Sequence, residues 1–295
     1  MYKPSFHNPQ NWLLLGLLTL IWGTSYILIK KGLIAFTPVE LTCLRIGISG
    51  LCAFPVAVGA IKFVPKEKYI TLLLVGLFSS AIPAFLFALS ITKSDSSVNG
   101  ILNALSPMWT ILVGYYVYHV IISKQKVTGV VIGFLGAVVL VVGKGLNNIK
   151  IDLAYGFLPL VATFCYGIGT NITKHKLQHD NPVGTTAVAM SMTGIPALIA
   201  CFFTGAIPKI ASGNVWPSLA CVAVLAVVST LTAWVLFYRL LQRTDALFAA
   251  SVTYLVPIVA LSWGLLDGEV LTLIQFGGMA LILMGVYFTT KTSAD

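Results

Sequence analysis

Charged residues are scarce in this chain: 9 % of its 295 residues are Asp, Glu, Lys or Arg, whereas 58 % are hydrophobic. A soluble domain carries roughly 25 % charged residues, because they cover its surface. The deficit excludes most soluble enzymes and nucleic-acid-binding proteins, and the mean hydropathy of +0.94 indicates a polytopic membrane protein. The 18 basic residues, against 9 acidic ones, are therefore expected to face anionic lipid rather than nucleic acid.

The chain also lacks the motifs of catalytic and metal sites. It has no H-E-x-x-H or G-x-S-x-G motif and no paired aspartates within an apolar run. His175 and His179 are spaced as i and i+4, but no convincing third ligand accompanies them. The cysteines lie in apolar runs without paired spacing, which is typical of small buried side chains: Cys43, Cys52, Cys165, Cys201 and Cys221. We expect no catalytic residue, metal or cofactor.

Ten long apolar runs, separated by short connections, occupy most of the sequence. They cover residues 12–34, 38–60, 69–91, 95–118, 127–144, 153–175, 183–205, 215–239, 245–266 and 270–289. A helix needs about 20 apolar residues to cross the hydrocarbon core. The runs are too long and too uniformly apolar for barrel strands. The predicted fold is therefore an all-α integral membrane protein with ten transmembrane helices.

The distribution of Lys and Arg predicts the orientation of these helices. With the N-terminus in the cytoplasm, eleven basic residues fall in cytoplasmic loops and six on the other side, while Arg45 lies within a span. Cytoplasmic loops carry the excess of Lys and Arg in membrane proteins. We therefore expect a multi-pass protein of a bacterial inner (cytoplasmic) membrane, with both termini in the cytoplasm.

Residues of the first half recur in the same order in the second half. The matching pairs, at offsets of 144 to 150 positions, are Trp22 and Tyr166, Gly50 and Gly194, Pro107 and Pro257, Gly129 and Gly278, and Gly136 and Gly285. Each half, 1–148 and 149–295, contains five spans, so the second copy must enter the membrane from the opposite side. Such inverted-topology repeats are common in transporters, with a binding site near the midplane. A duplicated scaffold without transport activity is the alternative.

These residues also resemble a known family. Leu20-Ile21-Trp22-Gly23-Thr24-Ser25-Tyr26, Pro38, Arg45 and Pro107, followed by Pro257, Gly268-Glu269, Gln275, Gly278 and Gly285, resemble an EamA-type member of the drug/metabolite transporter superfamily. The resemblance covers about residues 12–290. It implies ten helices in two inverted five-helix repeats and transport, often export, of amino acids and related metabolites. One departure is His119, which stands where the second half has Glu269.

Polar and aromatic side chains within the spans are the candidates for a solute site, because polar groups in lipid are costly unless they find partners or face a cavity. Asn99, Asn103, Ser106 and Thr110 share one face of the fourth span. The predicted substrate-binding residues are Trp22, Ser25, Tyr26, Asn99, Asn103, Ser106, Tyr166, Thr170, Asn171, Thr230, Trp234, Thr253 and Tyr254. The alternative for each is hydrogen bonding or packing between helices.

Two further features bear on gating and charge. Pro107 and Pro257 are repeat-related prolines, and they serve either as paired bends for gating or as fixed curvature. Thr37-Pro38-Val39-Glu40 predicts a capping box at the start of the second span. Arg45, about eight residues into that span, is expected to pair with Glu40 or a loop carbonyl, or else to face the solute path.

The sequence therefore predicts a transporter that moves small neutral or zwitterionic metabolites, such as amino acids or related compounds, by alternating access, in the direction of export. Facilitated diffusion or exchange is favoured over proton coupling, because the spans offer no convincing acidic relay. The partners expected are a small solute and membrane lipid, without nucleic acid, and a monomer can suffice. The alternatives are a phosphate-ester or nucleotide-sugar exchanger, which needs cationic groups, and a membrane-embedded enzyme.

Overall fold

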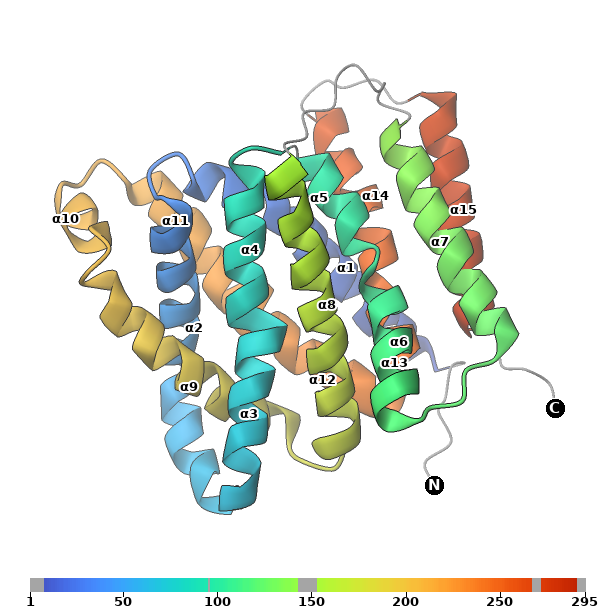
Figure 1. Cartoon of the computed structure of the whole chain (residues 1–295). Coiled ribbons are helices and arrows are strands. Elements are labelled where there is room, and N and C mark those ends of the chain that lie inside the picture. The colour runs from blue at the N-terminus through green and yellow to red at the C-terminus, as the bar shows by residue number, and fades with distance from the viewer. Residues whose placement is uncertain (1–7, 95, 143–152, 267–271, 291–295) are drawn as a thin grey trace.

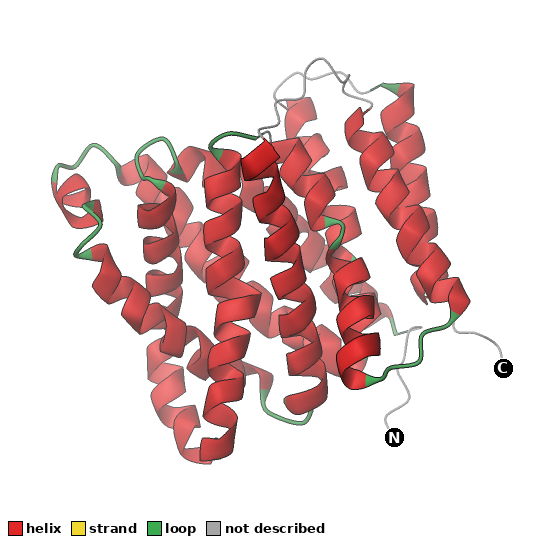
Figure 2. Ribbon diagram, in the orientation of Figure 1, coloured by secondary structure: helices red, strands yellow, loops and turns green. Residues whose placement is uncertain are grey.

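The computed structural model describes residues 8–94, 96–142, 153–266 and 272–290. Within these ranges the chain forms helices joined by short loops and contains no strand (Figure 2). Helices that are long and apolar enough to cross a membrane cover Pro9–Gly32, Pro38–Phe63, Lys66–Ile91, Pro182–Cys201 and Trp216–Arg243, and shorter apolar helices cover Ala246–Val259 and Phe276–Thr289. The described part thus has the all-helical fold of an integral membrane protein.

The helices of the first half lie on the blue to green part of the chain in Figure 1. They are α1 (Pro9–Gly32), α2 (Pro38–Ala60), η1 (Ile61–Phe63), η2 (Lys66–Lys68), α3 (Tyr69–Gly76), η3 (Leu77–Ala81), α4 (Ile82–Ile91), α5 (Ser96–Asn103), α6 (Ser106–Tyr118) and α7 (Lys124–Val142). The helices of the second half are α8 (Leu153–Lys176), α9 (Pro182–Cys201), α10 (Ala206–Ala211), α11 (Trp216–Val224), η5 (Leu225–Thr232), α12 (Ala233–Arg243), α13 (Ala246–Ala250), α14 (Val252–Leu266) and α15 (Leu273–Thr290).

The predicted capping box at the start of α2 is confirmed. The amide of Glu40 donates to Thr37 Oγ1 at 3.3 Å, and the amide of Thr37 donates to Glu40 Oε2 at 2.7 Å. The predicted pairing of Arg45 with Glu40 is wrong, because Glu40 Oε2 accepts instead from Lys209 Nζ at 2.6 Å. Glu40, the acid that was expected to pair with Arg45, is therefore already paired with Lys209 of α10.

Two of the expected continuous spans are broken near their middle. The run 95–118 forms α5 and α6, which are separated at residues 104–105, and the run 245–266 forms α13 and α14, which are separated at Ser251. Pro107 explains the first break, because it stands in the first turn of α6 and cannot continue a preceding helix. Pro257 lies inside α14 instead, so the two repeat-related prolines do not occupy equivalent positions relative to the breaks.

Two other spans contain a π-helical turn, η3 and η5. In η3 the amide of Ile82 donates to the carbonyl of Leu77, five residues back. Pro83 follows directly, and the clash of a proline ring with the carbonyl four residues earlier favours such a wider turn. In η5 the hydroxyl of Thr230 donates to the carbonyl of Leu225, also five residues back. Wide turns of this kind change which carbonyls remain available to other helices.

Helices of the two halves pack closely where glycines meet. A Cβ on Gly50 of α2 would lie 2.6 Å from Cα of Gly194 of α9. Along α7 and α15, a Cβ on Gly129 would lie 2.9 Å from the carbonyl oxygen of Gly285, and one on Gly136 would lie 2.9 Å from that of Gly278. In these two contacts the residue number rises along α7 and falls along α15. The two helices therefore run antiparallel, as Figure 1 shows. The glycines allow the backbones to touch.

Polar contacts join the loops at each end of the bundle. At one end Lys68 pairs with Asp180 at 2.7 Å, and Arg243 Nη1 donates to Gln10 Oε1 at 2.9 Å. At the other end Lys209 pairs with Glu40, and the hydroxyl of Ser218 donates to the carbonyl of Lys31 at 2.9 Å. Loops that the Lys and Arg distribution assigns to the same side of the membrane therefore lie at the same end of the structure.

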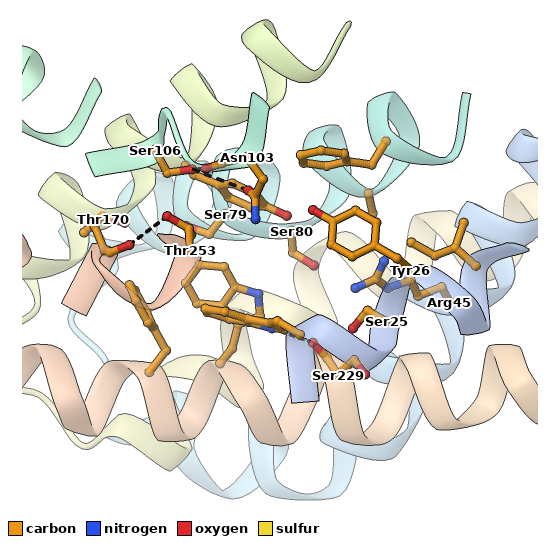
Figure 3. A pocket seen from close by; sticks show the side chains of 18 residues that line it. Ser25, Tyr26, Arg45, Ser79, Ser80, Asn103, Ser106, Thr170, Ser229 and Thr253 are labelled. Carbon is orange, nitrogen blue, oxygen red and sulfur yellow. Dashed lines mark hydrogen bonds between the residues drawn. The ribbon is translucent and has the colours of Figure 1, made fainter. Parts of the chain in front are cut away.

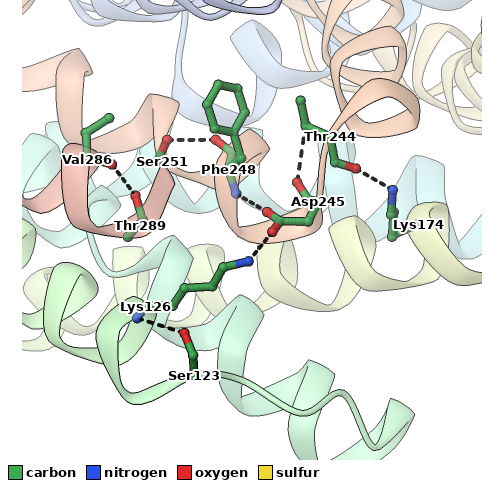
Figure 4. Close-up of polar contacts among 9 residues, drawn as sticks. All are labelled: Ser123, Lys126, Lys174, Thr244, Asp245, Phe248, Ser251, Val286 and Thr289. Carbon is green, nitrogen blue, oxygen red and sulfur yellow. Dashed lines mark hydrogen bonds and ion pairs between the residues drawn. The ribbon is translucent and has the colours of Figure 1, made fainter. Parts of the chain in front are cut away.

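The turn between α12 and α13 is held by two lysines (Figure 4). Lys126 of α7 forms an ion pair with Asp245, whose carboxylate also accepts from the amide of Phe248 at 2.7 Å and so caps α13. Lys174 of α8 donates to the carbonyls of Leu241 at 2.8 Å and Thr244 at 2.5 Å. The lysine thereby satisfies carbonyls at the end of α12 that have no helical partner. Asp95, which the repeat offset of 150 positions relates to Asp245, lies outside the described residues.

Candidate functional site

A cavity opens between the helices in the middle of the bundle, with about 790 Å³ of space that includes its part open to solvent. Figure 3 shows the 18 side chains that line it. The predicted residues among them are Trp22, Ser25, Tyr26, Asn103, Ser106, Tyr166, Thr170, Trp234 and Thr253. The cavity is also lined by Arg45, for which facing the solute path was one of the two alternatives. The remaining lining residues are Ile29, Ser79, Ser80, Ala84, Phe87, Ser229, Phe237 and Ala250.

The remaining predicted residues lie outside this lining. Asn171 Nδ2 donates to the carbonyls of Thr110 at 3.0 Å and Gly167 at 2.8 Å, and so ties α8 to α6. The hydroxyl of the fully buried Tyr254 donates to the carbonyl of Val130 at 3.0 Å. Asn171 and Tyr254 thus form hydrogen bonds between helices, which was the alternative to binding solute. Asn99 is fully buried away from the cavity, Thr230 bonds to Arg45, and Pro107 and Pro257 are also absent from the lining.

Aromatic rings form one wall of the cavity. The ring centroids of Trp22 and Trp234 are 5.9 Å apart, and Phe237 lies 5.4 Å from Trp22 and 5.1 Å from Trp234. Tyr166 continues the wall, with its ring 6.4 Å from Trp234 and stacked on Phe87 at 6.2 Å. Separations of 4.5–7 Å are typical of interacting aromatic pairs. The wall is suited to the apolar or planar part of a small organic solute.

The π-helical turn η5 fixes the orientation of Trp22. The amide of Ala233 donates to the carbonyls of Val228 and Thr230, which leaves the carbonyl of Ser229 between them available. Trp22 Nε1 donates to that carbonyl at 3.0 Å. A buried indole N–H needs such a partner. The irregular backbone of one half thus holds an aromatic side chain of the other half against the cavity.

Arg45 is the one charged side chain among the described lining residues. Its Nε donates to Thr230 Oγ1 at 2.8 Å. In the part of the chain that the structure describes, no carboxylate forms an ion pair with it. Figure 3 places its guanidinium between Tyr26 and Ser25, at one end of the cavity. The Nη groups therefore remain as donors without a protein carboxylate.

Both helix breaks lie on the cavity. The hydroxyl of Ser106 donates to the carbonyl of Asn103 at 2.8 Å across the first break. The hydroxyl of Thr253 donates to the carbonyl of Ala250 at 2.9 Å across the second. Ser79 of η3 also lines the cavity, and its Oγ is buried without a hydrogen-bond partner among the described residues. Discontinuous helices are a recurrent feature of transporter binding sites, since they expose backbone groups where a solute can use them.

Most lining residues correspond to one another in the internal repeat. The pairs, at offsets of 144 or 150 positions, are Trp22 and Tyr166, Tyr26 and Thr170, Ser79 and Ser229, Ala84 and Trp234, Phe87 and Phe237, and Asn103 and Thr253. Applying the repeat offset to Phe237 would have predicted Phe87, and to Ser229 would have predicted Ser79. Arg45 has no such counterpart, because its equivalent in the second half is Ala189.

The EamA-like transporter family model matches this chain twice, over residues 10–142 and 154–291. The chain belongs to that family. It is 29 % identical over 285 residues to a protein of Escherichia coli (strain K12) named a probable amino-acid metabolite efflux pump, covering 92 % of this chain and 91 % of that protein. An uncharacterized transporter of Archaeoglobus fulgidus is 27 % identical over 286 residues, covering 96 % of this chain and 99 % of that protein.

A solved crystal structure of a protein has the same fold. It aligns with a TM-score of 0.72 at 16 % sequence identity, over 96 % of this chain and 97 % of the other. A further relative, from Salmonella typhimurium (strain LT2), is 27 % identical over 283 residues and is also named a probable amino-acid metabolite efflux pump. The family and these names identify a membrane transporter and indicate transport rather than catalysis.

Proposed function

We propose that this transporter moves small neutral or zwitterionic metabolites, such as amino acids and related compounds, out of the cell by alternating access. The observation that carries the proposal is the central cavity, with aromatic rings on one wall and neutral polar groups at two helix breaks. Rings bind the apolar part of such a solute, and amides and hydroxyls bind its polar groups. The efflux-pump names of the relatives from Escherichia coli and Salmonella typhimurium support the substrate class and the direction.

We further infer that the ten expected spans form two inverted five-helix units, 1–148 and 149–295. The double match of one family model supports a duplication. The reciprocal contacts of Gly129 with Gly285 and of Gly136 with Gly278 support a two-fold relation, because exchanging the halves exchanges one contact for the other. In this arrangement one unit rocks against the other around the fixed cavity and exposes it to each side in turn.

The termini are assigned to the cytoplasm of a cell bounded by an inner membrane. The excess of Lys and Arg in the loops on that side supports this orientation. The Lys68–Asp180 and Lys126–Asp245 ion pairs, which hold those loops together at one end of the bundle, are consistent with it. Solute leaving the cell would thus enter from the end that carries these pairs.

Purified protein in liposomes tests the proposal directly. Liposomes loaded with a panel of labelled neutral amino acids and related metabolites should release at least one of them with saturable kinetics. The variant Ser79→Ala removes a lining hydroxyl and should change the apparent affinity, while Ser212→Ala, on an exposed loop, provides the matched control. A complete lack of movement of every solute by protein that is folded in detergent would refute the proposed function.

A further inference from the structure

We propose that Arg45 binds a carboxylate of the transported solute, which makes the protein selective for solutes that carry one carboxylate and an apolar or aromatic body. The inference rests on the proposed function and assigns the substrate chemistry of the same cavity. Its starting point is the guanidinium itself. Arg45 lines the cavity, and within the described residues Thr230 Oγ1 is its one hydrogen-bond partner.

An arginine in this position is costly unless an anion approaches it. Taking a cation out of water carries a desolvation penalty, which in proteins is normally offset by an ion pair. The nearby acid that could have supplied one, Glu40, accepts from Lys209 Nζ at 2.6 Å and from the amide of Thr37. A carboxylate brought in by the solute would complete the pairing that the described part of the protein leaves open.

The hydrogen bonds around Arg45 also fix its orientation. Thr230 Oγ1 donates to the carbonyl of Leu225 at 2.9 Å, so a lone pair of its oxygen is directed at Arg45 Nε. With Nε held in this way, the two Nη groups remain free to donate. A planar guanidinium and a carboxylate match as two parallel hydrogen bonds. Thr230, which belongs to the π-helical turn η5, therefore orients the guanidinium of Arg45 so that both Nη groups can bind one carboxylate.

The surroundings of Arg45 define the rest of the solute. Beyond the guanidinium lie the rings of Trp22, Trp234 and Phe237, which suit an apolar or aromatic body. A zwitterionic amino acid can place its ammonium group near Asn103 and the faces of these rings, which attract cations. The described lining carries no acid, so a solute with a second positive charge would be repelled by Arg45.

The charge count separates this solute class from phosphate esters. A phosphate monoester carries up to two negative charges at neutral pH, whereas the described lining supplies one positive charge. A single carboxylate neutralises it. The equivalent position in the second half is Ala189, so the anion would bind off the centre of the cavity, next to the first half.

Quenching of intrinsic tryptophan fluorescence in purified full-length protein provides a binding assay, because Trp22 and Trp234 line the cavity. The probes are L-phenylalanine, 3-phenylpropionate, the corresponding neutral amide 3-phenylpropanamide, and phenyl phosphate. Wild-type protein should bind the two carboxylates more tightly than the amide. Arg45→Gln should weaken carboxylate binding at least about 30-fold, as expected for loss of a buried charged partner, and should leave amide binding unchanged. Arg45→Lys should restore part of the affinity.

Two controls keep the result interpretable. Arg243→Gln makes the same change in charge at the end of the bundle, where Arg243 contacts Gln10, and should bind all probes as the wild type does. Retained amide binding by Arg45→Gln reports that the variant is folded, and if it fails to fold, Thr230→Val is used instead and should weaken carboxylate binding selectively. Equal binding of acid and amide by wild-type protein, unchanged carboxylate affinity in the folded variants, or tighter binding of phenyl phosphate would overturn the inference. Such an outcome would leave the transport proposal intact if liposomes still release a solute.

Discussion

Trp22 of the first half and Ser229 of the second are joined by a hydrogen bond of 3.0 Å from the indole Nε1 to the backbone carbonyl. The carbonyl is available because the amide of Ala233 passes over it within η5 and bonds to the carbonyls of Val228 and Thr230. An irregular helical turn and an aromatic ring from different halves therefore depend on each other at the wall of the cavity.

Trp22→Phe tests this dependence. The variant keeps an aromatic ring but leaves the carbonyl of Ser229 without its donor, and an unsatisfied buried acceptor costs roughly 1–3 kcal/mol. We expect a lower free energy of unfolding in detergent and slower solute release from liposomes. The matched control is Trp216→Phe, at an exposed tryptophan. Equal stability of Trp22→Phe and the wild type would show that the hydrogen bond contributes nothing.

Gly50→Ala tests the contact between α2 and α9. The new methyl group would lie 2.6 Å from Cα of Gly194, so the two backbones must separate. Overpacking of this kind costs about 1–3 kcal/mol, and the thermal unfolding midpoint in detergent should fall accordingly. Gly16→Ala is the control, because a methyl group there meets no atom within 4 Å. The interpretation fails if both alanine variants unfold at the same temperature.

Replacement of Asn103 is expected to affect transport, whereas replacement of Asn171 is expected to affect stability. Asn103 lines the cavity, and Asn103→Ala should slow solute release with little change in unfolding midpoint. Asn171 bridges α8 to the carbonyl of Thr110 in α6, and Asn171→Ala should lower the unfolding midpoint. Flux assays in liposomes and thermal unfolding in detergent are measured on both variants. The reverse pattern would mean that the cavity assignment of these two residues is mistaken.

Accessibility labelling of single cysteines tests the orientation of the halves. Position 66, the first residue of η2, and position 176, the last residue of α8, lie at the end where Lys68 pairs with Asp180, so Lys66→Cys and Lys176→Cys should both react from the same, cytoplasmic, side of the membrane. Ser212→Cys, next to Lys209 at the other end, should react from outside. Each is introduced after the five native cysteines have been replaced by serine or alanine. Reaction of positions 66 and 176 from different sides would refute the predicted topology.

The helices and their caps could be predicted from the sequence, whereas the breaks within them could not. Thr37 and Glu40 form the expected capping box because that motif is local and depends on a few neighbouring residues. The apolar runs read as continuous helices, because hydropathy responds to side chains and is insensitive to the backbone interruptions before Ser106 and at Ser251. Those interruptions are stabilised by side-chain hydrogen bonds and by packing in three dimensions.

The cavity was predicted in part for a related reason. Trp22, Asn103 and Trp234 stand out as polar or aromatic residues in apolar surroundings, and all three line it. Ser79 and Phe87 do not stand out, and they become candidates through the repeat offset that relates them to Ser229 and Phe237. Asn171 and Tyr254 satisfy the same compositional criterion, yet their hydrogen bonds are to neighbouring helices. Composition selects polar groups within a membrane, and the fold decides which of them are open to a solute.

The meeting of Gly50 with Gly194 has a mechanical consequence. At this crossing main-chain atoms of α2 and α9 approach each other directly, and Ser191 Oγ of α9 donates to the carbonyl of Gly50 at 3.3 Å, so few side chains separate the two helices. When two helices pivot about such a crossing, a small change in the angle between them produces larger displacements at their ends. One added methyl group at Gly50 would therefore restrict this change in angle as well as separate the two helices.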